Sequence, residues 1–148
     1  YKNTDAPTID AFVQIYIEEC AAEGVRADIA FAQAMNETGY LRFGGLVHIE
    51  DLNFAGMGAT DSPNDRNIAQ FTSVRMGVRA QIQHLKAYAC TDAIKNPIVD
   101  PRFKLVTRGC APYLEWLSIP NNPYGKGWAS DENYAGTING IIAKIKAQ

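Results

Sequence analysis

Glycine and proline are concentrated in two stretches of this chain, and this concentration restricts the folds it can adopt. Five of the twelve glycines lie within residues 39–72, and five of the seven prolines lie between Pro97 and Pro123. Both residue types are unfavourable in the interior of a helix. Outside the two stretches, apolar residues recur with the spacing of a helix face. The sequence therefore predicts a mainly helical protein with an irregular lobe after its second helix.

The apolar stripes and their capping residues predict four long helices. The first follows Thr8 and ends near Glu23, and the second covers residues 27–38. The third follows Ser73 and ends near Cys90. The last is capped by Ser130 and carries a stripe of Tyr134, Ile138, Ile141, Ile142 and Ile145. We also expect short helices at 102–109 and 111–117, and loops with short strands in the lobe, so the fold class is mainly α with a small β component.

Length and charge limit the domain count and the partners. With 148 residues, 47% of them hydrophobic, the chain is long enough for one domain with a sizeable core. We expect this domain to cover residues 8–148, with residues 1–7 as the end of a linker. The net charge of −2 argues against a nucleic-acid binder, which would carry a basic surplus. The apolar runs are too short to span a bilayer.

Glu37 is the candidate catalytic residue. It lies in the last turn of a predicted helix, where the negative end of the helix dipole disfavours an ionised carboxylate. Apolar cover from Met35, Tyr40 or Phe43 would raise its pKa further. A carboxylic acid that stays protonated near neutral pH is what a glycosidase uses to donate a proton to a leaving oxygen. The alternative is a solvated glutamate near a helix end.

The segment Asn53-Phe-Ala-Gly-Met-Gly-Ala-Thr60 is a candidate binding edge. Gly56 and Gly58 allow the backbone to approach a ligand closely, and Asn53 offers both a hydrogen-bond donor and an acceptor. Such an edge suits the hydroxyl and N-acetyl groups of a sugar chain. The alternative is a tight hairpin that binds nothing.

Five motifs occur in an order that resembles a known family. They are Ala34-Met-Asn-Glu-Thr-Gly-Tyr-Leu-Arg-Phe-Gly-Gly45, Asn53-Phe-Ala-Gly-Met-Gly-Ala-Thr60, Gly77-Val-Arg-Ala-Gln-Ile-Gln-His-Leu-Lys-Ala-Tyr88, Asp100-Pro-Arg-Phe103 and Trp128-Ala-Ser-Asp-Glu-Asn-Tyr134. Together they resemble the glucosaminidase domain of glycoside hydrolase family 73, the bacterial peptidoglycan endo-β-N-acetylglucosaminidases, over nearly all of residues 8–147. The resemblance implies a lysozyme-like, α-rich fold with a cleft between a helical body and a small β lobe.

The resemblance also implies roles for individual residues. It makes Glu37 the general acid and places Tyr134 in the active site, although the position of Tyr134 on an apolar stripe also suits a core residue. Trp128 either stacks on a sugar face or fills the start of the last helix. Asn53, Phe54 and Gly56 are expected to bind the substrate.

The second carboxylate of a two-acid mechanism is less well defined. The candidates in the lobe are Glu50, Asp51, Asp61 and Asp65. Some relatives carry a glutamate just before the segment that ends at Phe71, where this chain has Ala69-Gln70. Asp61 is favoured as a catalytic residue because it directly follows the candidate binding edge. The alternative nucleophile is the N-acetyl oxygen of the substrate.

The expected activity is cleavage of the β-1,4 bond after N-acetylglucosamine in peptidoglycan. A muramidase, a lytic transglycosylase and a non-catalytic glycan-binding module are the alternatives, because one scaffold hosts several functions. We expect the chain to act as a monomer on glycan strands, with no cofactor. It is expected to be a catalytic domain of a longer secreted or phage-borne protein.

The remaining reactive and charged residues have simpler interpretations. Cys20, Cys90 and Cys110 lack zinc-site spacing and predict buried thiols, with a bond between Cys90 and Cys110 as the alternative. No metal site is expected, and His84 is interpreted as a hydrogen-bonded packing residue. A basic stretch is expected to be solvated or to attract an anionic polymer; it consists of Lys86, Lys95, Lys104 and Arg108.

Overall fold

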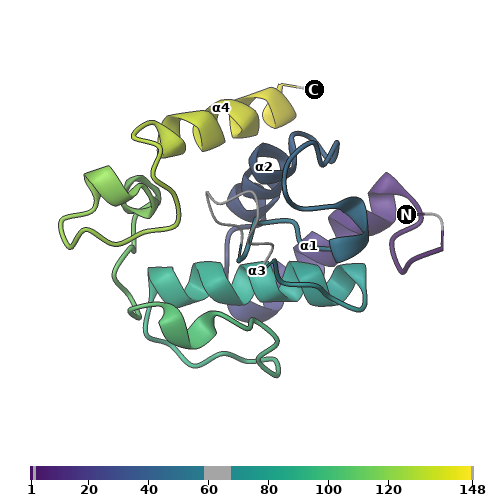
Figure 1. The fold of residues 1–148 in the computed structure, drawn as a ribbon, viewed down its shortest axis with the longest axis horizontal. Coiled ribbons are helices and arrows are strands. Elements are labelled where there is room, and N and C mark those ends of the chain that lie inside the picture. The colour runs from purple at the N-terminus through teal and green to yellow at the C-terminus, as the bar shows by residue number, and fades with distance from the viewer. Residues whose placement is uncertain (2, 59–67, 148) are drawn as a thin grey trace.

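The computed structural model describes residues 1, 3–58 and 68–147, and α-helices form the frame of this part of the chain (Figure 1). The α-helices are α1 (Ile9–Glu23), α2 (Ala27–Thr38), α3 (Val74–Ala89) and α4 (Tyr134–Lys146). Short 3₁₀ turns connect them: η1 (Ile49–Asp51), η2 (Phe103–Leu105), η3 (Leu114–Leu117) and η4 (Ile119–Asn121). The mainly helical fold is confirmed, and it agrees with a lysozyme-like helical body. Within the described residues the lobe after α2 consists of loop and η1, without the expected strands.

The first three helices match the predicted ranges, and local capping explains four of their six ends. The backbone N–H of Ala11 donates to the Thr8 hydroxyl, and that of Met76 donates to the Ser73 hydroxyl, each at 3.1 Å. These bonds satisfy N–H groups that have no partner within the helix. At the other end, α1 stops at Gly24 and α2 at Gly39, both in the left-handed conformation that glycine adopts without strain.

The predicted cap of the last helix is wrong. The N-cap of α4 is Asn133, three residues beyond Ser130. Tertiary contacts hold the intervening residues in a turn, because the Ser118 hydroxyl donates to the carbonyl of Asp131 at 2.8 Å. The Asp131 carboxylate then accepts the backbone N–H of Asn133 at 2.9 Å. The helix therefore begins at Tyr134.

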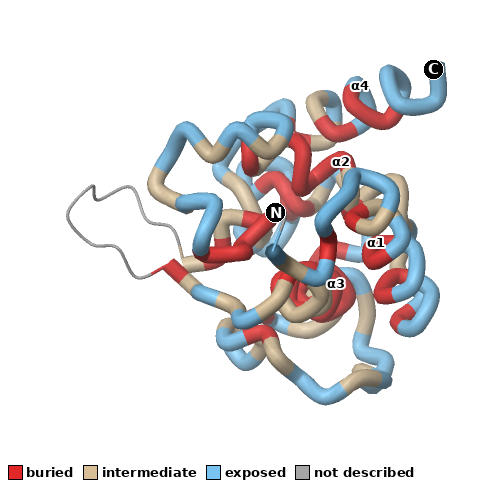
Figure 2. Tube along the Cα trace, turned by 90° about the vertical axis from the view of Figure 1, so that its right-hand side faces the viewer, coloured by how far each residue is buried: buried red, intermediate tan, exposed pale blue. Residues whose placement is uncertain are grey.

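The helices pack so that their buried faces meet at the centre of the molecule (Figure 2). Helix α1 packs against α2 and α3, and α4 packs against α2. Aromatic rings fill the space between α1, α2 and the lobe. The ring centroids of Phe12 and Phe54 are 5.2 Å apart, and those of Tyr16 and Phe31 are 5.6 Å apart. Phe54 thus anchors the lobe on the helical body.

Gly77 allows a direct backbone contact between α3 and the lobe. A Cβ atom built on Gly77 would lie 1.9 Å from the carbonyl oxygen of Leu52, a distance that no side chain tolerates. The absence of a side chain at this position lets the chain around Leu52 lie directly on the helix. It therefore sets how closely the lobe approaches α3.

The N-terminal residues pack against the domain, which differs from the picture of a bare linker end. The Asp5 carboxylate accepts the backbone N–H groups of Val74 and Arg75 at 2.8 and 3.0 Å. A carboxylate at the start of α3 is also favoured by the helix dipole. The Tyr1 hydroxyl donates to the carbonyl of Ile49, and Ala6 is buried. The domain boundary near residue 8 stays a prediction.

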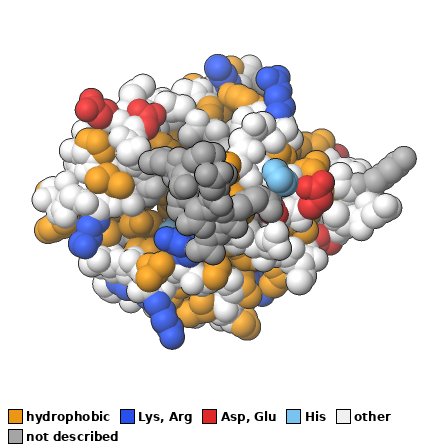
Figure 3. Space-filling view, viewed as in Figure 1, with side chains coloured by type: hydrophobic (Ala, Val, Ile, Leu, Met, Phe, Trp, Pro, Cys, Tyr) orange, Lys and Arg blue, Asp and Glu red, His pale blue; other side chains and the backbone are white. Residues whose placement is uncertain are grey.

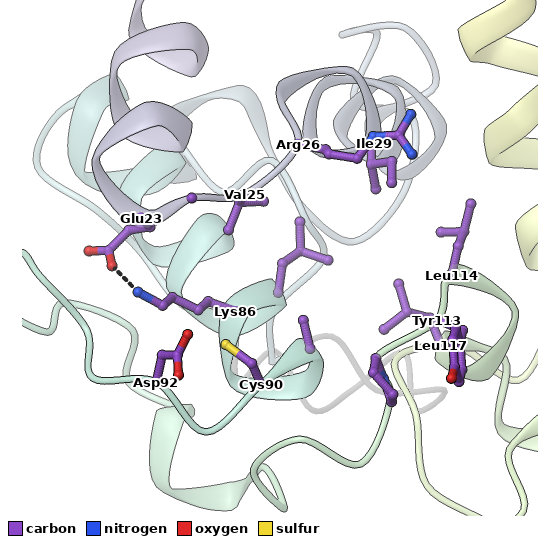
Figure 4. Close-up of a pocket in the computed structure, with 14 residues that line it drawn as sticks. Glu23, Val25, Arg26, Ile29, Lys86, Cys90, Asp92, Tyr113, Leu114 and Leu117 are labelled. Atoms are coloured by element: carbon purple, nitrogen blue, oxygen red, sulfur yellow. Dashed lines mark hydrogen bonds and ion pairs between the residues drawn. The ribbon is translucent and has the colours of Figure 1, made fainter.

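Lys86 contradicts the predicted solvated basic face. Its side chain is buried, and its ammonium group lies 2.9 Å from the Glu23 carboxylate at the end of α1 (Figure 4). The same ammonium group donates to the carbonyl of Ala93 at 2.9 Å. The backbone N–H groups of Lys95 and Asn96 also donate to Glu23. Glu23 therefore organises the chain that leaves α3.

Charged side chains of both signs are mixed on one face of the molecule (Figure 3), and the cysteines form no disulfide. On the face shown in Figure 3, basic and acidic side chains are scattered among neutral ones and form no patch of one sign. No helix in the described ranges is long and apolar enough to cross a membrane. All three cysteines are free, so Cys90 and Cys110 are not bonded to each other.

Candidate active site

Glu37 lies at the edge of a cavity of about 390 Å³ between the end of α2 and the lobe. The side chain is half-buried and belongs to the penultimate residue of α2. The other residues that line the cavity are Thr38, Gly39, Phe43, Gly44, Gly45, Leu46, Val47 and Gly56. None of these neighbours carries an ionisable side chain. The cavity is large enough for part of a sugar chain.

A cavity of similar size lies elsewhere on the helical body. This cavity of about 340 Å³ lies beside the Glu23–Lys86 pair and is bordered by residues of α1, α2, α3 and the segment around η3 (Figure 4). Glu37 does not line it. Its one buried ion pair is already satisfied, so we place the candidate chemistry at the Glu37 cavity.

The environment of Glu37 favours its protonated form. Burial raises the pKa of Glu37, and a hydrogen bond from the Tyr134 hydroxyl lowers it, with burial the larger effect. The direction agrees with the sequence prediction. A carboxyl group whose pKa is raised in this way keeps its proton to a higher pH than a free glutamate does, as a general acid requires.

Tyr134 combines the two interpretations that the sequence left open. It is the first residue of α4 and is buried in the apolar core. Its hydroxyl donates to Oε1 of Glu37 at 2.9 Å and accepts from Nε2 of Gln33 at 2.9 Å. Burial, followed by the nearby charge of Glu37, raises the pKa of Tyr134, so the phenol stays protonated and remains a donor.

Gly56 brings the backbone of the lobe next to the carboxyl group. Its φ is +67°, a conformation that favours glycine. A Cβ atom built there would lie 3.2 Å from Oε2 of Glu37. The glycine therefore leaves Oε2 open toward the space that a substrate would occupy. Gly56 thus lies beside Glu37, and its role in substrate binding stays a prediction.

Trp128 lines a second, smaller cavity, which shares the lining residue Gly56 with the first. This cavity of about 210 Å³ is bordered by Ala55, Gly56, Met57, Gly58, His84, Tyr88, Arg102, Gly127 and Trp128. Because Gly56 lines both spaces, the two cavities meet at the same backbone segment. The half-buried Trp128 ring packs edge-on against His84, with 4.7 Å between centroids. His84 is hydrogen-bonded to Asp100 at 2.7 Å, as a packing residue would be.

Asn53 and Phe54 differ from the prediction that their side chains contact the substrate. Both are fully buried. The Asn53 amide donates to the carbonyls of Met57 and Ala69 at 2.9 and 3.1 Å, and its oxygen accepts the N–H groups of Ala55 and Met57. These bonds fold the chain around Gly56. The two residues therefore shape the binding edge from within.

The described residues bring no second carboxylate to Glu37. Asp51 is buried and accepts the backbone N–H of His48 at 2.8 Å and the Gln70 amide at 3.1 Å. Glu50 is exposed, and neither residue lines the Glu37 cavity. Asp61 and Asp65 lie outside the described residues. Their roles stay predictions.

Comparison with known proteins identifies the family of the chain. The model of the Glucosaminidase family, described as mannosyl-glycoprotein endo-β-N-acetylglucosaminidase, matches residues 13–147. The chain belongs to the glucosaminidase family. A relative from Borreliella burgdorferi, described as uncharacterized, is 41% identical over 141 residues, which are 95% of this chain and 65% of the relative. No solved structure matches the chain significantly.

Sequence reasoning missed one residue of the candidate site, Gln33. It precedes Glu37 by four residues, so both side chains lie on one face of α2. Gln33 is fully buried, and its amide contacts the hydroxyl that holds Glu37. The signal in the sequence was a glutamine at an inward-facing position one turn before the predicted acid.

Proposed function

We propose that this glucosaminidase hydrolyses the β-1,4 bond on the reducing side of N-acetylglucosamine in peptidoglycan, with Glu37 as the general acid. The observation that carries the proposal is the half-buried Glu37, held by Tyr134 at the edge of an open cavity. Family membership supports glycoside hydrolysis as the reaction class. The substrate and the bond are inferred from the motif series.

The reaction assigns a defined task to each group. Glu37 transfers its proton to the glycosidic oxygen as the C1–O bond breaks, which leaves a carboxylate and a released alcohol. The Tyr134 hydroxyl stabilises that carboxylate, because hydrogen bonds to a charged acceptor are stronger than those to a neutral one. A carboxylate such as Asp61, or the N-acetyl oxygen of the substrate, stabilises positive charge at C1. Water then adds to C1, and its proton returns to Glu37.

The glycan strand would lie along the two cavities that meet at Gly56. Backbone groups of the lobe contact one part of the strand, and Trp128 provides an aromatic face for another. A polymer needs an open groove, which is consistent with action as a monomer. The proposed site of action is outside the cytoplasmic membrane. The chain spans 65% of the length of its relative, so we propose that it is the catalytic domain of a longer protein.

The experiment that tests the function is product analysis. Purified cell walls are digested with the protein, and the released fragments are reduced and identified by mass spectrometry. The proposal predicts fragments that end in reduced N-acetylglucosamine. Ends of reduced N-acetylmuramic acid would indicate a muramidase, and anhydromuramic ends would indicate a lytic transglycosylase.

Replacing Trp128 with alanine should weaken substrate binding. Loss of one stacked aromatic ring is expected to raise KM by roughly 3- to 10-fold, with a smaller change in kcat. Initial rates on solubilised glycan strands measure both constants. Trp116→Ala is the matched control, because Trp116 is also half-buried but lines neither cavity at Gly56. Equal effects of the two substitutions would argue against a sugar-binding role for Trp128.

A further inference from the structure

A chain of buried hydrogen bonds runs through all four α-helices and ends at Glu37. Its links are Tyr16 of α1, Gln81 of α3, Gln33 of α2 and Tyr134 of α4, and each of these residues is at most 2% exposed. The Tyr16 hydroxyl lies 2.6 Å from Oε1 of Gln81, and Nε2 of Gln81 lies 2.9 Å from Oε1 of Gln33. The contacts of Gln33 with Tyr134 and of Tyr134 with Glu37 complete the chain.

One backbone carbonyl determines the direction of every bond in this chain. Nε2 of Gln81 lies 2.9 Å from the carbonyl oxygen of Ala30, and a carbonyl oxygen only accepts. The amide nitrogen of Gln81 must therefore face Ala30, and its second hydrogen points to Gln33. Gln33 must present its oxygen to Gln81, which leaves its NH₂ group facing Tyr134. Neither glutamine can turn over without placing two donors or two acceptors together.

The direction of these hydrogen bonds also determines which oxygen of Glu37 carries the proton. Because the Tyr134 oxygen receives a hydrogen from Gln33, its own O–H hydrogen points to Oε1 of Glu37. The carbonyl oxygen of a carboxylic acid is a better acceptor than its hydroxyl oxygen. Protonated Glu37 therefore carries its hydrogen on Oε2, the oxygen that faces Gly56.

We propose that Gln33 and Gln81 are positioning residues which, anchored on the carbonyl of Ala30, keep Oε1 of Glu37 occupied and reserve Oε2 for the proton delivered to the substrate. The inference rests on the proposed role of Glu37 as the general acid. The two amides touch no substrate and act through Tyr134. The position of the acid proton of Glu37 therefore depends on hydrogen bonds inside the packed helical core.

Removal of the Gln33 donor gives a defined prediction. In Gln33→Met, the Tyr134 oxygen no longer receives a hydrogen and becomes free to accept one from Oε1 of Glu37. This alternative holds the acid proton on the wrong oxygen and stabilises the neutral carboxyl, so the pKa of Glu37 should rise. Tyr134, from α4, is the ionisable group that bears on Glu37 among the described residues, and the cavity loops contribute none. We expect kcat to fall roughly tenfold with KM little changed.

Two measurements test the prediction with a matched control. Titration of the Glu37 carboxyl carbon by ¹³C NMR reports its pKa without any need for activity, and initial rates give kcat and KM. Gln81→Met breaks the chain one link earlier and should shift both quantities in the same direction, by less. Gln83→Met is the control. Gln83 is equally buried on α3, but it bonds Pro97, Val99 and Asp100 instead.

The outcomes separate this inference from the proposed function. A Glu37 titration that is the same in Gln33→Met, Gln83→Met and wild type would overturn the positioning role. If the methionine variants do not fold, the test uses the wild-type protein alone. The NMR signal of the Tyr134 hydroxyl proton should then exchange slowly with water and shift as Glu37 titrates. A signal that does not respond to this titration would reject the inference. A wild type that cleaves no glycan, yet shows the expected titrations, would reject the proposed function only.

Discussion

Replacing Glu37 with glutamine should reduce kcat by roughly 10³-fold, which is the range that a positioned general acid contributes. An amide has nearly the same shape as a carboxyl group and still accepts the hydrogen bond from Tyr134, but it has no acidic proton to transfer. Binding should therefore survive while bond cleavage is lost. The measurement is the initial rate of new reducing ends released from cell walls, together with sedimentation of the protein with the same walls.

Glu18→Gln is the control for this substitution, because Glu18 is an exposed glutamate on α1 that lines neither cavity at Gly56. It should cleave at the wild-type rate. If wild type and Glu37→Gln both bind walls equally and neither cleaves them, the chain is a glycan-binding module. Full activity in Glu37→Gln would assign the acid role to another residue.

The same variant has a predicted pH signature. Burial raises the pKa of Glu37 in the folded protein above its ordinary value of about 4.3. The stability that the protonated group contributes is therefore complete below that ordinary value and is lost as pH rises through the folded pKa. Relative to wild type, Glu37→Gln should gain stability over this interval, as measured by urea unfolding at several pH values. Wild-type kcat should fall over the same interval as the acid ionises.

Removing the carboxylate of Glu23 should cost about 3–5 kcal/mol of unfolding free energy. In Glu23→Ala, the buried ammonium group of Lys86 keeps only the carbonyl of Ala93, and the backbone N–H groups of Lys95 and Asn96 lose their acceptor. Urea unfolding at pH 7 measures the loss. Neither residue of the pair lines the Glu37 cavity, so the folded fraction should retain its kcat.

Asp28→Ala provides the matched comparison for a helix-terminal ion pair. Asp28 bonds Arg26 at 2.7 Å, but the Arg26 side chain is 67% exposed, so the loss of unfolding free energy should stay below about 1 kcal/mol.

The Glu23 pair should also depend on pH. Burial raises the pKa of Glu23, but its hydrogen bonds with Asn96, Lys95 and Lys86 outweigh this and lower the pKa overall. The Glu23 contribution is therefore present above its ordinary pKa and lost as pH falls through the folded pKa. Equal losses at Glu23 and Asp28 would contradict a special role for burial.

The helices were predictable where local signals alone determine their ends. Thr8 and Ser73 cap their own helices, and Gly24 and Gly39 end theirs, so both ends of α1, the end of α2 and the start of α3 follow from local sequence. The start of α4 depends on Ser118, twelve residues or more away, and no local pattern reveals that contact. Lys86 was misjudged for the same reason, because its partner Glu23 lies 63 residues earlier.

The candidate site likewise combines local features, which the sequence predicts, with long-range contacts, which it does not reveal. The position of Glu37 at a helix end is a local feature and was predicted, whereas the substrate-binding role of Gly56 stays a prediction. The contact of Tyr134 with Glu37 spans 97 residues, and the family resemblance supplied what periodicity left open. Phe54 is buried because it packs against Phe12 of α1, and Asn53 is buried because its amide bonds Met57 and Ala69 of the lobe, contacts that the apparent polarity of a glycine-rich segment conceals.

The close approach at Gly77 has a consequence for how freely this protein tolerates substitution. Position 77 borders neither cavity, yet even an alanine methyl group there would collide with the carbonyl of Leu52 and displace the chain that leads to Gly56. In a library that samples every amino acid at every position, selected for glycan cleavage, position 77 should be as restricted as position 37. Position 140, where a methyl group on the helix would meet nothing within 4 Å, should accept alanine freely. The positions at which substitution abolishes function therefore include a residue inside α3 that borders neither cavity.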